Sequence, residues 1–200
     1  MQALKLTATG IAILYCRKIF RFGKLKPIHA LIALSALPAA MLSWMGPFYL
    51  LSAVGWIDFA SLSSPQAYTA LYVFMRLANS VVLVAVFEEL FIRVYIMGWF
   101  YQAGLQKQEK GLVGSLLDVL DQRPTPASGL PLSLFSVAGA AIVFAAGHHS
   151  YEYLSAVLYF LFTTWLYKKS SSLWVCIIIH ALTNLGIGLL AVYGGMGWLW

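Results

Sequence analysis

The sequence predicts an all-α, polytopic membrane protein, a bundle of about 5–6 transmembrane helices with one polar cytoplasmic loop. Composition is the first observation behind this prediction. Of the 200 residues, 61% are apolar and only 10% are charged, and the mean hydropathy is +0.81. Soluble globular domains are about 25% charged, so this chain lacks the polar side chains to cover a water-facing surface. A soluble enzyme, a coiled coil, a collagen-like chain and a disordered chain are therefore excluded.

Apolar runs of spanning length are the second observation, because a transmembrane helix needs about 20 mostly apolar residues. The run at 28–54 qualifies, and Pro38 and Pro47 are expected to kink it. The run at 67–101 is too long for one untilted crossing. Residues 6–16 are too few to span comfortably, so an interfacial anchor there is the alternative to a sixth crossing. Three more runs complete the set, at 131–148, 151–167 and 173–193.

A polar segment at 102–130 separates the second run from the third. Its proline- and glycine-containing part is typical of a loop, and residues 111–122 suit a short interfacial helix. We expect residues 1–27 to form a basic N-terminal segment that suits the membrane interface. Residues 28–200 are expected to form a single transmembrane helical domain.

Basic residues predict the orientation. The net charge of +6 comes from 13 Lys and Arg against 7 acids. Most of the positive charge lies at 17–26, at 102–130 and at Lys168–Lys169, whereas 55–66 and 149–152 carry none. Because Lys and Arg concentrate on the cytoplasmic side, we expect a multi-pass protein of the plasma or inner membrane with a cytoplasmic N-terminus. The polar sequence is too short to build a basic face for nucleic acid, so no such partner is expected.

Two adjacent glutamates, Glu88 and Glu89, lie inside the second apolar run. Insertion scales give about 2.5–3.5 kcal/mol for Asp at the centre of a membrane helix, so intramembrane carboxylates need partners or a proton. Arg93 follows Glu89 by one helical turn on the same face and is expected to neutralise it. Glu88, about 100° away around the helix, then faces elsewhere. The alternative is that both glutamates only make interhelical salt bridges, with Arg76 and Arg93 as partners.

Three further polar side chains lie in the later runs. His148 ends the third run, and His180 and Asn184 share one face of the last. A lone histidine on an apolar face is usually a satisfied core residue. Here two histidines, one asparagine and Glu88 fall on three hydrophobic segments, and a rise of about 1.5 Å per residue places all four inside the hydrocarbon. We therefore expect these four side chains to share one site.

Such a site suits hydrolysis of an amide bond by activated water. A carboxylate and a neutral imidazole can hold and deprotonate a water molecule. A second imidazole and a carboxamide, one helical turn apart, can donate hydrogen bonds to a developing oxyanion. Neither a serine nucleophile nor a reactive cysteine is needed, and Cys16 and Cys176 lie far apart in apolar runs. His149 and His29 receive no role.

The same residues resemble the motifs of a known protease family. The chain is similar to the CPBP (CAAX protease and bacteriocin-processing, or Abi) intramembrane proteases, which include the type II CAAX prenyl endopeptidases, in three ordered motifs: Glu88-Glu89-x-x-x-Arg93, Phe144-x-x-x-His148 and His180-x-x-x-Asn184. These motifs span 88–184, and each lies on a hydrophobic segment. One departure is Val94, where family members often have glycine.

The resemblance implies an intramembrane endopeptidase of the glutamic type, from a family long described as metalloendopeptidases. It implies that Glu88 and His148 position the attacking water and that His180 and Asn184 form the oxyanion hole. The implied supporting residues are Glu89, Arg93 and Phe144. The implied substrate is a membrane-embedded or lipid-modified polypeptide in the bilayer, cut in CAAX-type processing or in protein sorting beside an exosortase-like enzyme.

Three alternatives stay open at this stage. A non-catalytic membrane protein, such as a bacteriocin immunity factor or a scaffold for partner helices, would use these residues only for packing. An ion-coupled carrier would use the carboxylates, although about five crossings without an inverted repeat argue against it. Zinc is the third alternative, with four candidate ligands: Glu88, Glu89, His148 and His180. Because an H-E-x-x-H helix is absent and Asn184 is a poor zinc ligand, we expect a metal-free mechanism without a cofactor.

Overall fold

The computed structural model describes residues 23–62, 69–119 and 132–199, together with Thr7, Gly10, Ile11, Ile13 and Leu14. Within these ranges the chain is helical and has no β-strand, which confirms the predicted all-α class. The predicted segment 1–27 and the undecided crossing at 6–16 fall largely outside the described residues. The division into that segment and one helical domain stays a prediction.

Each of the five predicted apolar runs corresponds to a helical stretch, in the expected order. The first is α2 (Pro27–Ala53). The second is a composite helix made of α4 (Ala70–Leu77), η1 (Ala78–Val84), α5 (Ala85–Glu88), η2 (Glu89–Ile96) and α6 (Met97–Asp118). The remaining three are α7 (Leu134–Ala146), α8 (Tyr153–Ser170) and α9 (Leu173–Tyr193). Short segments accompany them: α3 (Phe59–Leu62), η3 (Ser150–Glu152) and η4 (Gly197–Leu199).

Three stretches in the described part of the chain are long and apolar enough to cross a membrane: α2, Ala70–Gln106 and α9. The apolar helix α7, with 13 residues, is shorter than a full crossing of about 20 residues. α2 stays unbroken through Pro38 and Pro47. The protein is thus a polytopic helical membrane protein in which some helices are short, as the sequence predicts.

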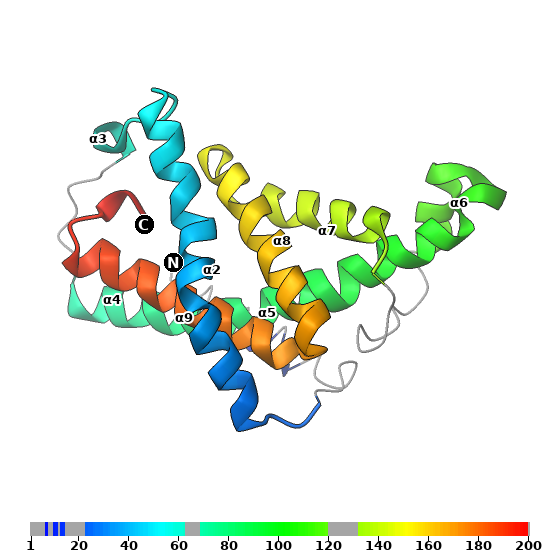
Figure 1. The fold of residues 1–200 in the computed structure, drawn as a ribbon, viewed down its shortest axis with the longest axis horizontal. Coiled ribbons are helices and arrows are strands. Elements are labelled where there is room, and N and C mark those ends of the chain that lie inside the picture. Colours follow the sequence, from blue (N-terminus) through cyan, green and yellow to red (C-terminus); the bar gives the residue numbers. More distant parts are fainter. Residues whose placement is uncertain are drawn as a thin grey trace.

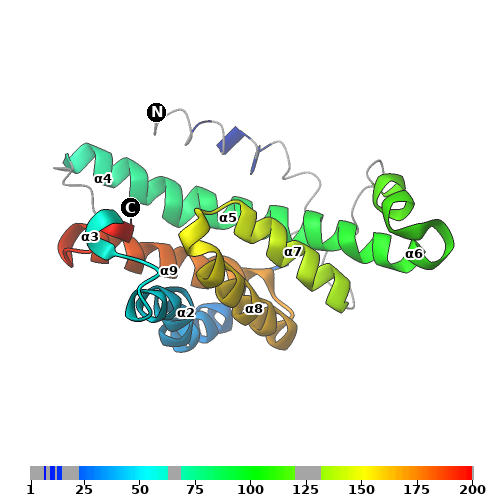
Figure 2. The same cartoon turned by 90° about the horizontal axis from the view of Figure 1, so that it is seen from above.

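The composite helix is the longest element of the fold. Figure 1 shows it as one rod that runs from α4 through α5 into α6, which folds back on itself near its end. In the view from above, α2, α8 and α9 lie on one side of this rod (Figure 2). α2 packs against α8 and α9, and α7 packs against α6 and α8. This arrangement brings the middle of the rod next to helices from the C-terminal half of the chain.

Local sequence signals explain where several helices begin and end. α2 starts at Pro27, whose ring fixes the backbone for a first helical turn and whose missing N–H needs no partner there. Thr69 caps α4 by accepting a hydrogen bond from the Tyr72 backbone N–H. Ser133 and Ser136 cap α7 reciprocally. α8 ends at Ser171, which adopts a left-handed conformation with φ of 50°.

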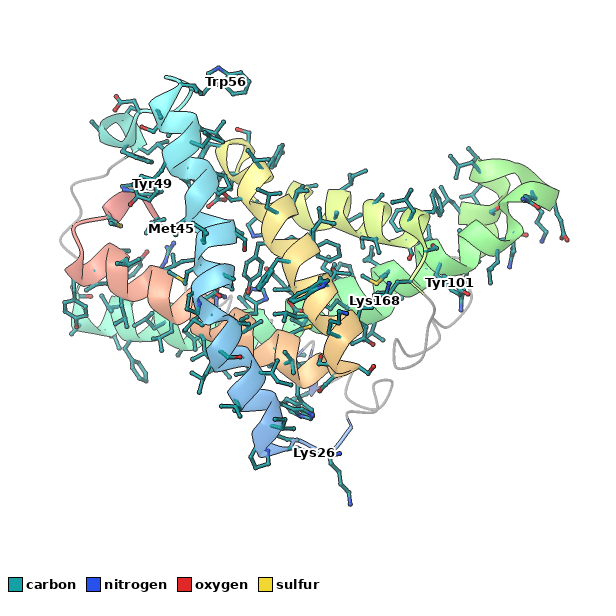
Figure 3. The ribbon with its side chains drawn as sticks, viewed as in Figure 1. Lys26, Met45, Tyr49, Trp56, Tyr101 and Lys168 are labelled. Atoms are coloured by element: carbon teal, nitrogen blue, oxygen red, sulfur yellow. The ribbon has the colours of Figure 1, made fainter. Side chains whose placement is uncertain are left out.

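The interior of the bundle contains several large aromatic side chains, and many large apolar side chains lie on its outer surface. Trp44, Phe48, Phe144, Tyr159 and Phe160 belong to its main core cluster. Leucines and other large apolar side chains are exposed along the outside of the helices, as expected where the surroundings are lipid rather than water. Lys26 and the exposed Trp56 lie at opposite ends of α2 (Figure 3). Cationic and tryptophan side chains are both favoured at membrane–water interfaces.

The polar segment 102–130 is helical in its first part, because α6 continues to Asp118. The chain turns at Gly111, whose φ of 71° and ψ of 171° suit only glycine, and is helical again up to Asp118. Trp99 Nε1 donates to the Leu116 carbonyl at 3.2 Å, so the second piece folds back along the first. The proline- and glycine-containing part that was predicted as a loop lies outside the described residues, so that prediction stays untested. The short helix predicted at 111–122 is present up to residue 118, and residues 120–131 lie outside the described part.

Candidate active site

The glutamate pair lies where the composite helix changes from α to π geometry. Glu88 is the last residue of α5, and Glu89 is the first residue of the π-helical segment η2. A second π-helical segment, η1, precedes α5. π-Helical turns hold an extra residue per turn and occur frequently at functional sites. The Glu89 side chain is only 4% exposed, whereas that of Glu88 is 30% exposed.

Glu89 forms a buried ion pair with Arg93. Arg93 Nε donates to Glu89 Oε2, across the four-residue spacing that places both side chains on one helix face. The arginine, 1% exposed, also donates to Thr163 and Thr164 of α8. A buried charge pair stabilises a fold only when hydrogen bonds satisfy its remaining donors and acceptors, and these threonines supply acceptors. One glutamate therefore does make a salt bridge with a structural role.

His180 lies against both glutamates. Its Nδ1 atom is 3.1 Å from Glu89 Oε1, and its Nε2 atom is 3.8 Å from Glu88 Oε2. The second distance is too long for a hydrogen bond. An ionised carboxylate can only accept hydrogen bonds. The Nδ1 atom of His180 therefore carries a hydrogen and donates a hydrogen bond to Glu89. The imidazole is thus fixed through one nitrogen and presents the other toward the more exposed carboxylate.

His148 follows the C-terminal end of α7, directly after Gly147. Its Nδ1 atom is 2.8 Å from the Phe144 carbonyl oxygen. A carbonyl cannot donate, so Nδ1 carries the proton, and in the neutral ring Nε2 holds the lone pair. The ring packs against Phe144 and Trp44, with centroid distances of 4.8 and 5.3 Å. His148 is half-buried just beyond the end of α7, and its Nε2 atom is the nitrogen not engaged by the Phe144 carbonyl.

The motif residues converge only in part. Phe144 contacts both histidine rings, at a centroid distance of 6.4 Å from His180. Among the described residues, no hydrogen bond or ion pair joins His148 to Glu88, the two groups predicted to hold water together. Glu88 contacts His180 instead, because α9 lies directly beside α5.

Asn184 lies one helical turn beyond His180 on α9 and reaches the composite helix. Its Nδ2 atom donates to the Ser80 carbonyl oxygen at 2.8 Å. Ser80 belongs to the π-helical segment η1. A carboxamide nitrogen carries two hydrogens, so this bond leaves a second donor available. Asn184 thus ties α9 to the rod and keeps one N–H for another acceptor.

Sequence analysis missed the contributions of α2 and α8. Trp44 of α2 packs edge-on against both His148 and Tyr159, and Tyr159 in turn packs against His180. Thr163 and Thr164 of α8 hold Arg93. The adjacent threonines were a usable signal, since two hydroxyls inside the apolar run 151–167 invite a polar partner. The aromatic residues offered no such signal, because 15% of the chain is aromatic and nothing in the sequence distinguishes Trp44 or Tyr159 from the others.

Zinc does not fit the arrangement of the candidate ligands. Among the described residues, no three His, Cys, Asp or Glu side chains gather closely enough to hold a metal ion. Glu89 is occupied by Arg93 and His180, and the Nδ1 atom of His148 by a backbone carbonyl. The four residues named for zinc therefore offer no common coordination sphere in this structure.

Comparison with known proteins adds the family. No curated protein and no solved structure matches this chain. A family model described as "type II CAAX prenyl endopeptidase Rce1-like" matches residues 69–186, more than half of the 200 residues. The match includes every motif residue discussed above, from Glu88 to Asn184. The chain therefore belongs to the Rce1-like family of type II CAAX prenyl endopeptidases, a family of membrane proteases.

Proposed function

We propose that this protein is an intramembrane endopeptidase of the glutamic type, which hydrolyses a peptide bond in a membrane-associated polypeptide. The observation that carries the proposal is the placement of two carboxylates around one imidazole in the bundle interior. Glu89 is buried and paired, whereas Glu88 is partly exposed and lies 3.8 Å from His180 Nε2. A carboxylate is costly inside a membrane, so a partly exposed glutamate that has a histidine rather than an arginine or lysine as its charged neighbour favours a chemical role.

Glu88 and His148 position and deprotonate the attacking water in this proposal. The Phe144 carbonyl fixes the His148 tautomer that leaves Nε2 as a proton acceptor. The water oxygen attacks the carbonyl carbon of the scissile bond, and its proton passes to the Glu88 carboxylate. Glu88 then returns the proton to the leaving nitrogen as the C–N bond breaks. A small closure of α7 toward α5, once substrate is bound, brings His148 to the water, since catalytic contacts are often loose in a free enzyme.

His180 and Asn184 stabilise the oxyanion that forms on the scissile carbonyl oxygen. His180 donates from Nε2 only as an imidazolium, and carboxylates on both sides of the ring stabilise that form. Asn184 donates the Nδ2 hydrogen that Ser80 does not use. Removing one such donor in other enzymes lowers kcat by about 10²–10³-fold. Glu89 and Arg93 brace this half of the site, and Phe144 packs between the histidines.

The proposed mechanism needs no metal and no cofactor. Its proton acceptor is a carboxylate, and its oxyanion is met by an imidazolium and an amide. A metal-free mechanism is preferred to a zinc-dependent one, because the candidate ligands among the described residues do not share a coordination sphere. Removal of divalent metal with a chelator is therefore expected to leave cleavage unchanged, and a loss of activity restored by zinc would contradict this part.

The proposed substrate is a lipid-modified polypeptide delivered within the bilayer. Membership of a CAAX prenyl endopeptidase family supports a prenylated C-terminal segment as the first candidate. Processing of a sorting signal, beside an exosortase-like enzyme, is the second. The positive charge near the N-terminus and at Lys168–Lys169 supports a plasma or inner membrane location with a cytoplasmic N-terminus.

Adjacent histidines offer a matched test of the proposal. A farnesylated peptide ending in a CAAX sequence is incubated in detergent with wild type, His148→Ala and His149→Ala, and cleavage is followed by mass spectrometry. His149 is exposed and stacks on Tyr151, outside the site. We expect His148→Ala to lower kcat by about 10²-fold or more and His149→Ala to leave it unchanged. Equal activity of wild type and His148→Ala would contradict the proposal, as would a wild type that cleaves neither this peptide nor a sorting-signal peptide.

A further inference from the structure

Helix α8 carries none of the three motifs, yet its middle turns contact the polar centre of the site. Arg93 Nη1 donates to Thr164 Oγ1 at 2.6 Å, and Arg93 Nη2 donates to Thr163 Oγ1. The guanidinium also lies over the ring of Phe160, with 4.8 Å between Cζ and the ring centroid. Two hydroxyls and one aromatic face of α8, together with Glu89, therefore define the position of the guanidinium plane.

The hydroxyls of Thr163 and Thr164 are buried acceptors for the Arg93 guanidinium. Thr163 gives its own hydrogen to the Tyr159 carbonyl oxygen at 2.8 Å, which leaves its oxygen free to accept from Arg93. A guanidinium only donates. Arg93 is 1% exposed, Thr163 is 0% exposed and Thr164 is 5% exposed, so solvent does not reach this contact. Loss of either hydroxyl leaves a buried, charged N–H without its acceptor.

The two carboxylate oxygens of Glu89 bind different partners, Arg93 and His180. Oε2 accepts from Arg93 Nε, and Oε1 lies 3.1 Å from His180 Nδ1. A guanidinium that turns toward a new acceptor moves the carboxylate with it. The carboxylate in turn determines which His180 nitrogen carries the proton and where the ring points. In metal sites, removal of the groups that orient the ligands typically lowers metal affinity or activity by about 10–100-fold, and we expect an effect at the lower end of this range here.

We propose that Thr163 and Thr164 are positioning residues of the protease. They hold Arg93, Arg93 holds Glu89, and Glu89 holds His180 at the angle needed to meet the oxyanion. This inference rests on the proposed function of the site. It assigns to α8 a role in catalysis, exerted through three side chains rather than by contact with substrate, and it predicts an effect on turnover rather than on substrate binding.

Isosteric variants test the role of the hydroxyls. Thr163→Val/Thr164→Val removes both acceptors and keeps the side-chain shape, whereas Thr163→Ser/Thr164→Ser keeps both acceptors. Ser155→Ala is the control, because Ser155 lies on the same helix, is 1% exposed, and its hydroxyl has no hydrogen-bond partner among the described residues. Each purified full-length protein is assayed with the farnesylated CAAX peptide for kcat and KM, and its thermal unfolding is recorded.

We expect the valine pair to lower kcat about 10-fold with KM changed by less than about twofold, the serine pair to retain wild-type kcat, and Ser155→Ala to match wild type. A folded valine pair with wild-type kcat overturns the inference, and so does a serine pair that loses as much as the valine pair. If the wild type cleaves the peptide, either of these results contradicts only the positioning role and not the proposed protease function. If the wild type does not cleave the peptide, both the positioning role and the proposed function are contradicted. If the valine pair does not fold, Thr164→Val alone is judged by the same criteria.

Discussion

The site has two halves that differ in burial and in hydrogen bonding. In the first half, Arg93 and Glu89 are almost completely buried, and each side chain is held by charged or polar partners. In the second half, the Glu88 side chain is 30% exposed and lies 3.8 Å from the nearest histidine nitrogen. The two glutamates are neighbours in the sequence but point to different sides of the helix. Glu89 faces Arg93 of its own helix and His180 of α9, whereas Glu88 faces the far nitrogen of His180.

In the proposed mechanism, the buried half positions other side chains and the more exposed half takes part in proton transfer. Buried polar networks that are fully satisfied are rigid, because any movement leaves a charge or donor without a partner. Groups that must exchange a proton with water need the opposite: access and a free lone pair. A membrane interior makes the contrast sharper, since water is not available to replace a lost hydrogen bond. His180 lies between the halves, with one nitrogen toward each glutamate.

Arg93→Leu is expected to have the largest effect on stability. Removal of the guanidinium leaves the Glu89 carboxylate buried with only His180 as a partner. Breaking one partner of a buried pair typically costs about 3–5 kcal/mol. We expect a loss of this size in the free energy of unfolding, measured by denaturant titration in mixed micelles, together with loss of cleavage. An Arg93→Leu protein as stable as wild type would show that the buried half does not brace the fold.

Asn184→Ala is expected to lower kcat more than it lowers stability. The substitution removes one proposed oxyanion donor, which lowers kcat by about 10²–10³-fold, and it removes the Ser80 hydrogen bond, which contributes about 1 kcal/mol to stability. Steady-state kinetics on the CAAX peptide and thermal unfolding check the two effects separately. A variant that unfolds more easily but cleaves at the wild-type rate would restrict Asn184 to helix packing.

Gly139→Ala is expected to have the smallest effect on turnover, because it reaches the site only through packing. A Cβ atom at Gly139 of α7 would lie 2.6 Å from the Phe100 ring of α6, so the helices must separate. Overpacking of this kind costs about 1–3 kcal/mol. Because His148 follows the end of α7, we also expect a modest fall in kcat. Gly114→Ala is the control, since the nearest neighbour of its new Cβ atom is the Lys110 Cβ atom at an ordinary contact distance of 3.5 Å. Equal stability of both variants would contradict the close packing.

Contacts within one helix were predictable from the sequence. Helical geometry alone puts residues four apart on one face, so the Glu89–Arg93 pair and the shared face of His180 and Asn184 follow from spacing. The apolar runs likewise predict the five helical stretches, because only a helix satisfies every backbone group in lipid. Spacing within a helix and the length of an apolar run can be interpreted without knowing which other helices pack beside that segment.

Contacts between helices were not predictable in detail. A membrane helix that is apolar on all sides gives no preferred buried face, so its rotation against its neighbours is not encoded in the pattern. The sequence therefore suggested Glu88 beside His148, whereas the structure places His180 beside both glutamates. The acceptors Thr163 and Thr164 were missed for the same reason. The π-helical segments around the glutamates carry no sequence signature at all.

The paired variants Glu88→Gln and Glu89→Gln test the division of the site most directly, with kcat and the free energy of unfolding measured on the same samples. We expect Glu88→Gln to lose about 10²–10⁴-fold in kcat, as for loss of a general base, at wild-type stability. We expect Glu89→Gln to lose stability as well as activity, because Arg93 then lacks its buried counter-charge. A folded Glu88→Gln protein that cleaves the farnesylated peptide at the wild-type rate would contradict the account.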